Sequence, residues 1–143
     1  MPAEWDSVGN IKGPAGTDGA PGPPGPVGPS GQRTPTTLPD ATTLTPDYKF
    51  DMCIQNNTQV AGTLTVANPV TSEAGSPAPA EGRGLLLRIK TANAQTLVFG
   101  SQYRAPTYLP FPAGTTAATT MYIGFVRNAV DSKWDLSTVL RDY

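Results

Sequence analysis

Glycine occupies every third position from Gly13 to Gly31, so residues 13–33 form seven consecutive Gly-X-Y triplets. In a collagen-like triple helix, three extended chains wind around a common axis at which only the hydrogen side chain of glycine fits. A strict period of three has no such role in a single chain. We therefore expect three copies of this chain to share a triple-helical stalk, which makes the protein a homotrimer. The predicted axis positions are Gly13, Gly16, Gly19, Gly22, Gly25, Gly28 and Gly31.

The non-glycine positions of the triplets are rich in proline, which fixes φ before folding begins and lowers the entropy lost on ordering. A disordered Pro/Gly tether is the alternative, but such a spacer needs no register. At a rise of about 3.1 Å per residue, the stalk would span roughly 60 Å. Seven triplets are few for a helix without hydrogen bonds inside each chain. We therefore expect the C-terminal part of the chain to bring the three strands into register.

Length and charge restrict the remaining 34–143 segment to one modest domain. The chain has 143 residues and a formal net charge of -1, so nothing in it attracts nucleic-acid phosphates strongly. No apolar segment approaches the roughly 20 residues needed to cross a bilayer, and no export signal opens the chain. We expect no membrane insertion, and synthesis in the cytosol.

The residue types that usually carry catalysis are scarce. Histidine is absent, and the single Cys53 therefore lacks the usual base partner of a catalytic thiol, which favours a small apolar role. A glycosidase would need two carboxylates beside a sugar-sized groove, but turn formation and solvation explain the available Asp and Glu residues more simply. We expect no enzymatic activity, no catalytic residue, no cofactor and no metal site.

Two segments flank the stalk. Residues 1–12 are too short to fold alone and carry the isolated apolar residues Trp5, Val8 and Ile11, so they either fray or dock on a partner. Residues 34–47 are rich in threonine and proline, which favours an extended neck.

Residues 48–143 alternate between apolar and polar side chains with period two. The first such run places Tyr48, Phe50, Met52 and Ile54 on one face, and the pattern recurs in 60–66, 85–90, 97–99, 121–126 and 134–140. Turn-rich segments separate these runs, and none resembles a helix. The pattern predicts an all-β head domain, a β-sandwich or jelly-roll-like fold.

A second set of apolar residues falls on what should be the outer face of the strands. Leu86, Tyr122 and Val126 have the opposite parity to their buried neighbours. In a trimer this face can pack against the neighbouring heads around the threefold axis, which would also protect sheet edges from aggregation.

Aromatic and guanidinium side chains of the head are candidates for contact with a host surface or its glycans. Trp134, beside a tight turn, is better explained by packing, as Tyr103 can also be. Tyr108 and Phe111 lie among prolines in a long loop, where recognition residues are often placed, and Arg104 precedes them. We expect Tyr108, Phe111 and Arg104 to form the exposed contact surface.

Several motifs together carry a resemblance to a known class of proteins. They are the Arg88-Ile89-Lys90 strand, the Gly100-Ser101-Gln102-Tyr103-Arg104 turn and the Ser132-Lys133-Trp134-Asp135 hairpin. These resemble the small C-terminal β-domain of tail fibres, minor tail proteins and head fibres of tailed bacteriophages. The opening Trp5-Asp6-Ser7-Val8-Gly9-Asn10-Ile11-Lys12 is similar to the lead-in to collagen-like segments in minor tail proteins of phages of actinobacteria.

The resemblance implies a structural protein on the virion surface that is synthesised in the host cytoplasm. Its N-terminal segment would dock on other virion proteins, and a minor tail protein or tail fibre is the favoured location. A head fibre or capsid decoration protein is the alternative location, and a host-surface glycan attachment module is the alternative activity. A bacterial collagen-like adhesin is disfavoured because neither an export signal nor a cell-wall anchor is visible.

Overall fold

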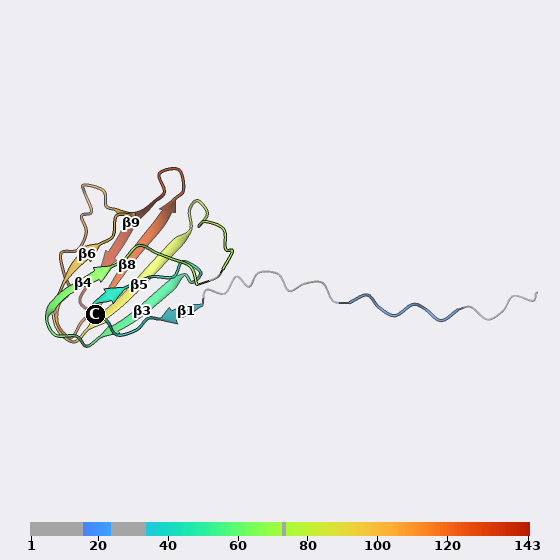
Figure 1. Ribbon diagram of the computed structural model, residues 1–143, viewed down its shortest axis with the longest axis horizontal. Coiled ribbons are helices and arrows are strands. Elements are labelled where there is room, and N and C mark those ends of the chain that lie inside the picture. The colour runs from blue at the N-terminus through green and yellow to red at the C-terminus, as the bar shows by residue number, and fades with distance from the viewer. Residues whose placement is uncertain (1–15, 24–33, 73) are drawn as a thin grey trace, which may run out of the picture. The chain divides into compact units, whose positions relative to one another are not determined.

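The computed structural model describes residues 16–23, 34–72 and 74–143, and it divides into two compact units, 1–30 and 31–143. In the first unit, residues 16–23 form neither a helix nor a strand, and their side chains are exposed. The second unit is the β-head (Figure 1). No helix occurs in the described residues, which confirms the all-β prediction. The same residues therefore contain no helix that could cross a membrane.

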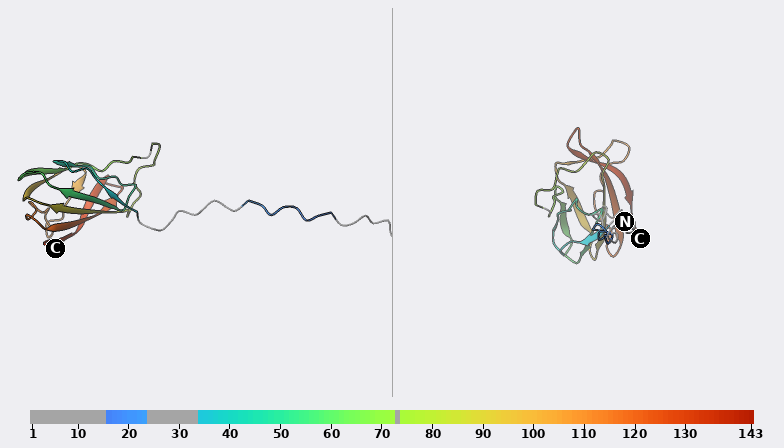
Figure 2. Two further views of the ribbon diagram at one scale, coloured as in Figure 1. Left: turned by 90° about the horizontal axis from the view of Figure 1, so that it is seen from below. Right: turned by 90° about the vertical axis from the view of Figure 1, so that its right-hand side faces the viewer.

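The head consists of two β-sheets that enclose one core (Figures 1 and 2). The larger sheet has six strands in the order β1-β3-β5-β8-β9-β7, and the smaller has three in the order β2-β4-β6. The strands of the larger sheet are β1 (Pro35–Thr37), β3 (Met52–Asn57), β5 (Gly84–Thr91), β8 (Thr120–Asn128), β9 (Lys133–Leu140) and β7 (Tyr103–Arg104). Those of the smaller sheet are β2 (Thr43–Leu44), β4 (Gly62–Val66) and β6 (Gln95–Phe99).

The segment predicted to be a neck, residues 34–47, supplies the first strand of each sheet. β1 pairs with β3, and β2 pairs with β4. The head therefore begins at Pro35 and not at Tyr48. The extended backbone that proline and threonine favour here is used for strand pairing.

From β1 to β6 the chain alternates between the two sheets, and all strand pairs within this part are parallel. The chain therefore makes three coils, β1–β2, β3–β4 and β5–β6, each with one strand in either sheet. β8 and β9 then form an antiparallel hairpin beside β5. A jelly roll consists of antiparallel strands, so the jelly-roll-like alternative does not describe this topology.

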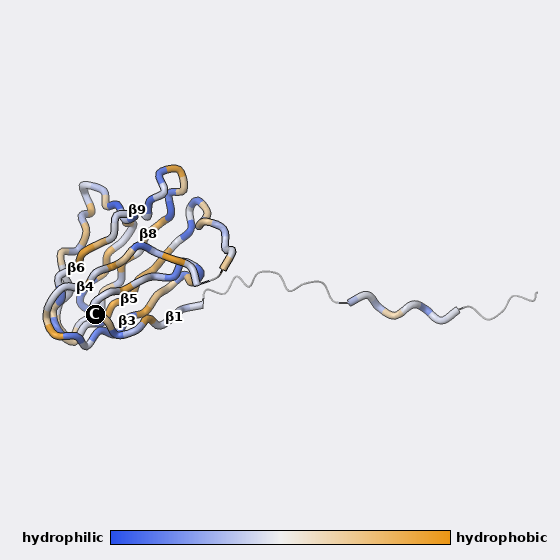
Figure 3. The backbone as a smooth tube through the Cα atoms, viewed as in Figure 1, coloured by the Kyte–Doolittle hydropathy of each residue, from blue (hydrophilic) through white to orange (hydrophobic). Residues whose placement is uncertain are grey.

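The core lies between the sheets and follows the period-two pattern. In β5 the side chains of Leu85, Leu87 and Ile89 are buried, whereas Leu86 and Arg88 point to the other side and are half-buried. The most hydrophobic segments of the head include β5 and β8 (Figure 3). Burying each such side chain contributes about 1.5–3 kcal/mol. The buried apolar cluster comprises Leu44, Cys53, Leu64, Val66, Leu85, Leu87, Ile89, Leu97, Tyr103, Met121, Ile123, Phe125, Trp134 and Leu136.

β3 has the opposite orientation to the predicted one. Cys53 and Gln55 are fully buried, whereas Met52 and Ile54 lie half-buried on the outer side of the sheet. The apolar role predicted for Cys53 is confirmed, because its side chain belongs to the core. The amide of Gln55 faces inward because its Nε2 donates hydrogen bonds to the carbonyl oxygens of Pro39 and Ala41, at 3.0 and 3.1 Å.

Polar side chains hold together the corners at which the chain leaves the larger sheet. The Asp40 carboxylate, in the first corner, accepts hydrogen bonds from Thr58 and Gln59 in the second. The side chain of Asn93, in the third corner, donates to the carbonyl oxygen of Gln59 at 3.0 Å. Successive corners are thus tied to each other, and the buried amides of Gln55, Asn57 and Gln95 donate to further backbone carbonyl groups of the corners.

The loop before β8 covers the edge of the smaller sheet. The backbone N–H of Leu97 donates to the carbonyl of Ala113, and that of Thr115 donates to the carbonyl of Gln95, both at 2.9 Å. Gly114 is required between them, because a Cβ atom there would lie 2.5 Å from the Gln95 carbonyl oxygen. The contact shields an edge that would otherwise present unpaired backbone groups.

Candidate functional site

The predicted docking residues Trp5, Val8 and Ile11 lie outside the described residues, as do the axis positions Gly13, Gly25, Gly28 and Gly31. Their proposed roles therefore stay predictions from the sequence.

Gly16, Gly19 and Gly22 are described, and nothing among the described residues requires glycine at these three positions. A Cβ atom added at any of them would meet no atom within 4 Å. None of the three has a positive φ. Glycine is ordinarily required by close packing or by a left-handed backbone, and neither applies here. The triple-helical role of these positions stays a prediction from the sequence.

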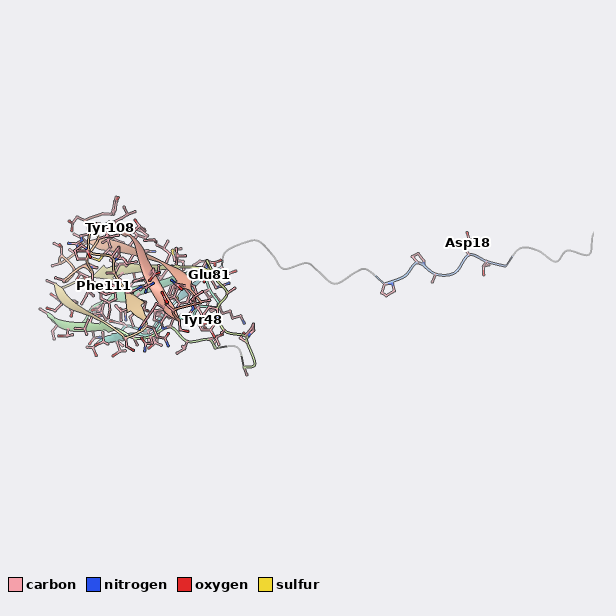
Figure 4. The ribbon with its side chains drawn as sticks, turned by 90° about the horizontal axis from the view of Figure 1, so that it is seen from above. Asp18, Tyr48, Glu81, Tyr108 and Phe111 are labelled. Atoms are coloured by element: carbon pink, nitrogen blue, oxygen red, sulfur yellow. The ribbon has the colours of Figure 1, made fainter. Side chains whose placement is uncertain are left out.

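The three residues predicted to contact a host surface do not share one environment. The Tyr108 side chain is 89% exposed. Phe111 is half-buried and stacks on Phe99 next to the core, so the prediction that it is an exposed contact residue is not met. Prolines around Phe111 suggested an open loop, but the loop folds back against β6. Figure 4 shows the positions of Tyr108 and Phe111 on the head.

Arg104 is exposed and forms hydrogen bonds to two carboxylates. Its Nε and Nη2 atoms donate to the two oxygens of Asp135 at 2.7 and 2.9 Å, and its Nη1 donates to Asp131 at 2.8 Å. These bonds raise the pKa of Arg104, and the bond from Arg104 is the main cause that lowers the pKa of Asp135. Both partners stay charged near neutrality, and the pair is bidentate.

Arg104 and Tyr108 do line one shallow hollow of about 280 Å³, together with Pro106 and Asp135. An exposed aromatic ring beside a carboxylate–guanidinium pair offers both a stacking surface and hydrogen-bonding groups to a polar ligand. The lowered pKa of Asp135 keeps its carboxylate ionised, which suits hydrogen bonding to a polar ligand.

Trp134 and Tyr103 pack in the core, as the sequence favoured. Their side chains are 1% and 6% exposed, and they occupy paired positions on β9 and β7. The Tyr103 hydroxyl donates to the carbonyl of Ala67 at 2.9 Å. Neither ring is available to stack on a ligand at the surface.

The outward-facing apolar residues predicted from their parity lie together on the outer side of the six-stranded sheet. Strand register places Leu86 beside Gly124, and Val126 follows Gly124 on the same face of β8. Tyr122 precedes Gly124 by two residues and pairs with Leu140 of β9, which is 47% exposed. We call this surface the outer face. Its apolar members are Met52, Ile54, Leu86, Tyr122, Val126 and Leu140.

Gly124 lies in the middle of the outer face, between Leu86 and Thr138, and has no side chain there. A Cβ atom on it would lie 2.6 Å from the Thr138 methyl group, so a side chain there would force the Thr138 side chain to shift. Tyr143 extends the face beyond the strands, because its ring meets the ring of Tyr122 edge-on, with 6.1 Å between the ring centroids. Sequence reasoning found Leu86, Tyr122 and Val126 but missed Met52 and Ile54, because it assigned their parity to the core.

The described residues contain no group of three or more His, Cys, Asp or Glu residues that could hold a metal ion. Comparison with protein-family models, with curated proteins and with solved structures finds no match. No family is therefore assigned, and the resemblance to phage fibres stays a prediction from the sequence.

Proposed function

We propose that this chain is a non-enzymatic structural protein of a tailed-bacteriophage virion, most simply a minor tail protein or tail fibre. Three copies form a collagen-like stalk over residues 13–33, the β-heads project from the particle, and residues 1–12 dock on other virion proteins. The proposal rests on one observation above all: Gly16, Gly19 and Gly22 belong to a strict period of three, although no contact among the described residues and no positive φ requires glycine there. Two further chains around a common axis would require it.

The outer face supports the same assembly. Its apolar side chains are only half-buried in the single chain, and Val126 and Leu140 are 40% and 47% exposed. Burial of such a surface against further copies would remove apolar area from water. β1 lies at an edge of the same sheet and begins two residues after the last triplet. We propose that three outer faces surround the threefold axis and hold the stalk chains in register.

Sedimentation and native mass spectrometry of the full chain test the assembly, and we expect a trimer. Val126→Lys and Leu140→Lys should give monomers, because they put charge on the outer face. Val98→Lys is the matched control: Val98 is 49% exposed, but it lies on the smaller sheet. A monomeric wild-type protein, or equal behaviour of all three variants, would remove the outer-face trimer.

The stalk is tested separately by the circular dichroism of the triple helix. Gly19→Ala should abolish its cooperative melting, whereas Thr17→Ala, in the preceding triplet, should leave it nearly unchanged. The melting of the head provides a check that the variants fold. Absence of any triple-helix signal in the wild-type trimer would overturn the collagen-like stalk but not the head interface.

The location on the particle is tested by counting labelled copies. A tail tip has few symmetric attachment points and a capsid has many, so a high copy number would favour a head fibre or decoration protein.

The hollow beside Tyr108 and Arg104 favours host-glycan attachment as a second activity. Binding of purified trimers to host cells should then fall for Tyr108→Ala and stay unchanged for Val130→Ala, a 91% exposed residue of the β8–β9 turn. Equal binding by both variants would remove Tyr108 from the contact surface.

A further inference from the structure

Arg127 is a buried cation without a hydrogen-bond acceptor for its Nε atom. The residue lies near the end of β8, and only 9% of it is exposed. The Arg127 N–H donates to the carbonyl of Arg83 at 2.8 Å, and the Arg127 carbonyl accepts from the N–H of Gly82 at 2.9 Å. Its Nε is buried and has no partner among the described residues, in contrast to Arg104 with its two carboxylates.

Such an arrangement is costly in a folded protein. Transfer of a guanidinium from water is compensated only when an anion and hydrogen-bond acceptors replace the lost hydration. The Arg127 guanidinium does lie over the Trp134 ring, 5.8 Å from its centroid. This contact offsets part of the cost, but an aromatic face accepts no strong hydrogen bond. An acceptor from outside the chain would complete the site.

The same side chain lines a cavity of about 300 Å³ at the end of the sandwich where the β4–β5 loop lies. This volume is at the lower end of the range for small-molecule sites. Three loops contribute to the walls, namely the β2–β3, β4–β5 and β6–β7 connections. The lining of the cavity includes Tyr48, Pro69, Pro79, Gln102, Arg127 and Trp134. Figure 4 shows Tyr48 at this end of the head, away from Tyr108.

Hydrogen bonds fix the walls of the cavity before any ligand arrives. The backbone N–H of Tyr48 donates to Val70 at 2.8 Å, and the side chain of Arg83 donates to the Tyr48 carbonyl at 2.7 Å. The N–H of Gln102 donates to the Asn68 side chain at 2.9 Å. A preformed site loses little entropy on binding.

We propose that this cavity binds a small carboxylate attached to a compact ring, such as a sugar acid. The carboxylate pairs with the Arg127 guanidinium, whose planar fork matches its two oxygens. The ring lies against Pro69, Pro79 and Tyr48, and the Gln102 amide is the polar group available to its substituents. One cation suits one negative charge, which favours a carboxylate over a phosphate dianion. The site requires neither the trimer nor a position on a virion.

Fluorescence of Trp134 reports binding directly. The chain has two tryptophans, so the full chain with Trp5→Phe leaves Trp134 as the sole reporter. The probes are glucuronate, benzoate, inorganic phosphate, uncharged glucose and a short acidic peptide. We expect saturable changes with glucuronate and benzoate, at least tenfold weaker binding of phosphate, and none of glucose. Tighter binding of glucuronate than of benzoate identifies a sugar acid. Binding of the peptide alone, or of no probe, would overturn the proposal.

Variants at Arg127 separate a binding role from a packing role. In the Trp5→Phe background, Arg127→Gln should weaken glucuronate binding at least tenfold, and Arg127→Lys should recover only part of it because the fork is lost. Arg88→Gln, on the outer face, is the matched control and should bind like the parent. Arg127→Gln should also melt at or above the temperature of the ligand-free parent, because it removes an uncompensated charge. Unchanged binding by Arg127→Gln would show that Arg127 serves packing alone, and a clear fall in its melting temperature without ligand would contradict the uncompensated charge.

Discussion

The ring of Phe111 lies nearly parallel to the ring of Phe99, with 4.5 Å between their centroids and 14° between their planes. Phe111 comes from the long loop before β8, and Phe99 ends β6. The stack therefore fastens this loop to the smaller sheet. Phe99 in turn contacts Tyr103 and Phe125, which connects the loop to the centre of the core.

Phe111→Ala should lower the free energy of unfolding by about 2–4 kcal/mol, because it removes a stacked ring from the edge of the core. Urea unfolding followed by circular dichroism measures the change. Tyr108→Ala is the matched control, since its ring is 89% exposed, and it should change stability by less than about 0.5 kcal/mol. Similar losses for both variants would mean that the Phe111 ring does not contribute through the stack.

Asp40 predicts a specific pH dependence of stability. Hydrogen bonds from the Thr58 side chain first, then from the Thr58 backbone and Gln59, lower the pKa of its carboxyl group below the ordinary 3.8. A carboxyl group whose pKa is lower in the folded state contributes stability above its unfolded pKa and loses it as pH falls through its folded pKa. Asp40→Asn should therefore be less stable than the parent at pH 7.

The difference between Asp40→Asn and the parent should shrink steadily as the pH is lowered below about 4. Urea unfolding at pH 7 and pH 3 provides the comparison. Asp142→Asn, at an exposed position near the C-terminus, is the control that should follow the parent at both values. A constant difference across this range would show that the Asp40 carboxylate does not tie the corners through its charge.

Gln55→Leu should destabilise the head although it makes a buried residue more hydrophobic. Ala41 keeps a second donor, the Asn57 side chain at 2.9 Å, whereas the Pro39 carbonyl would lose the donor that Gln55 provides. The substitution also removes the Gln55 Oε1, a buried atom without a hydrogen-bond partner, so the expected loss lies at the lower end of the roughly 1–3 kcal/mol that an unsatisfied polar group costs. Asn56→Leu, at the next and exposed position, should change the free energy of unfolding by less than about 0.5 kcal/mol. Stabilisation by Gln55→Leu would contradict this account of the corner.

Gly114→Ala tests the loop that covers β6. The new Cβ atom would lie 2.5 Å from the Gln95 carbonyl oxygen, so the bridge to Thr96 must shift. We expect a loss of about 1–3 kcal/mol in urea unfolding. Gly62→Ala has its nearest contact at 3.7 Å and should be neutral or slightly stabilising. An unchanged Gly114→Ala protein would mean that the loop accommodates a side chain there without cost.

The orientation of most strands could be predicted because alternation alone determines it. Leu85, Leu87 and Ile89 are buried as their pattern indicated. Met121, Ile123 and Phe125 are buried in the same way. β3 was misassigned because both of its faces carry apolar residues, and a buried amide decides between them. Gln55 faces inward to satisfy carbonyls far away in sequence, which no local pattern reveals.

The topology and the Arg127 cavity needed the structure. The break between the first alternating run and the 60–66 run gives no sign in sequence that the chain passes into the other sheet there. Arg127 continues the buried parity of Ile123 and Phe125, so its burial has a visible signal in sequence, but arginine is ordinarily exposed. The lack of an acceptor for Arg127 depends on which loops converge on that residue. The stacking of Phe111 on Phe99 likewise depends on how a loop folds.

The parallel coils have a consequence for how such heads can vary in size. A coil leaves the larger sheet, crosses the smaller one and returns in the original direction, one strand spacing or about 4.8 Å further along. Insertion of a whole coil would preserve the direction of every existing strand, whereas insertion of one hairpin strand would reverse those that follow. Longer and shorter members of this architecture can therefore arise by duplicating or deleting a coil, with the first strand and the closing hairpin kept intact.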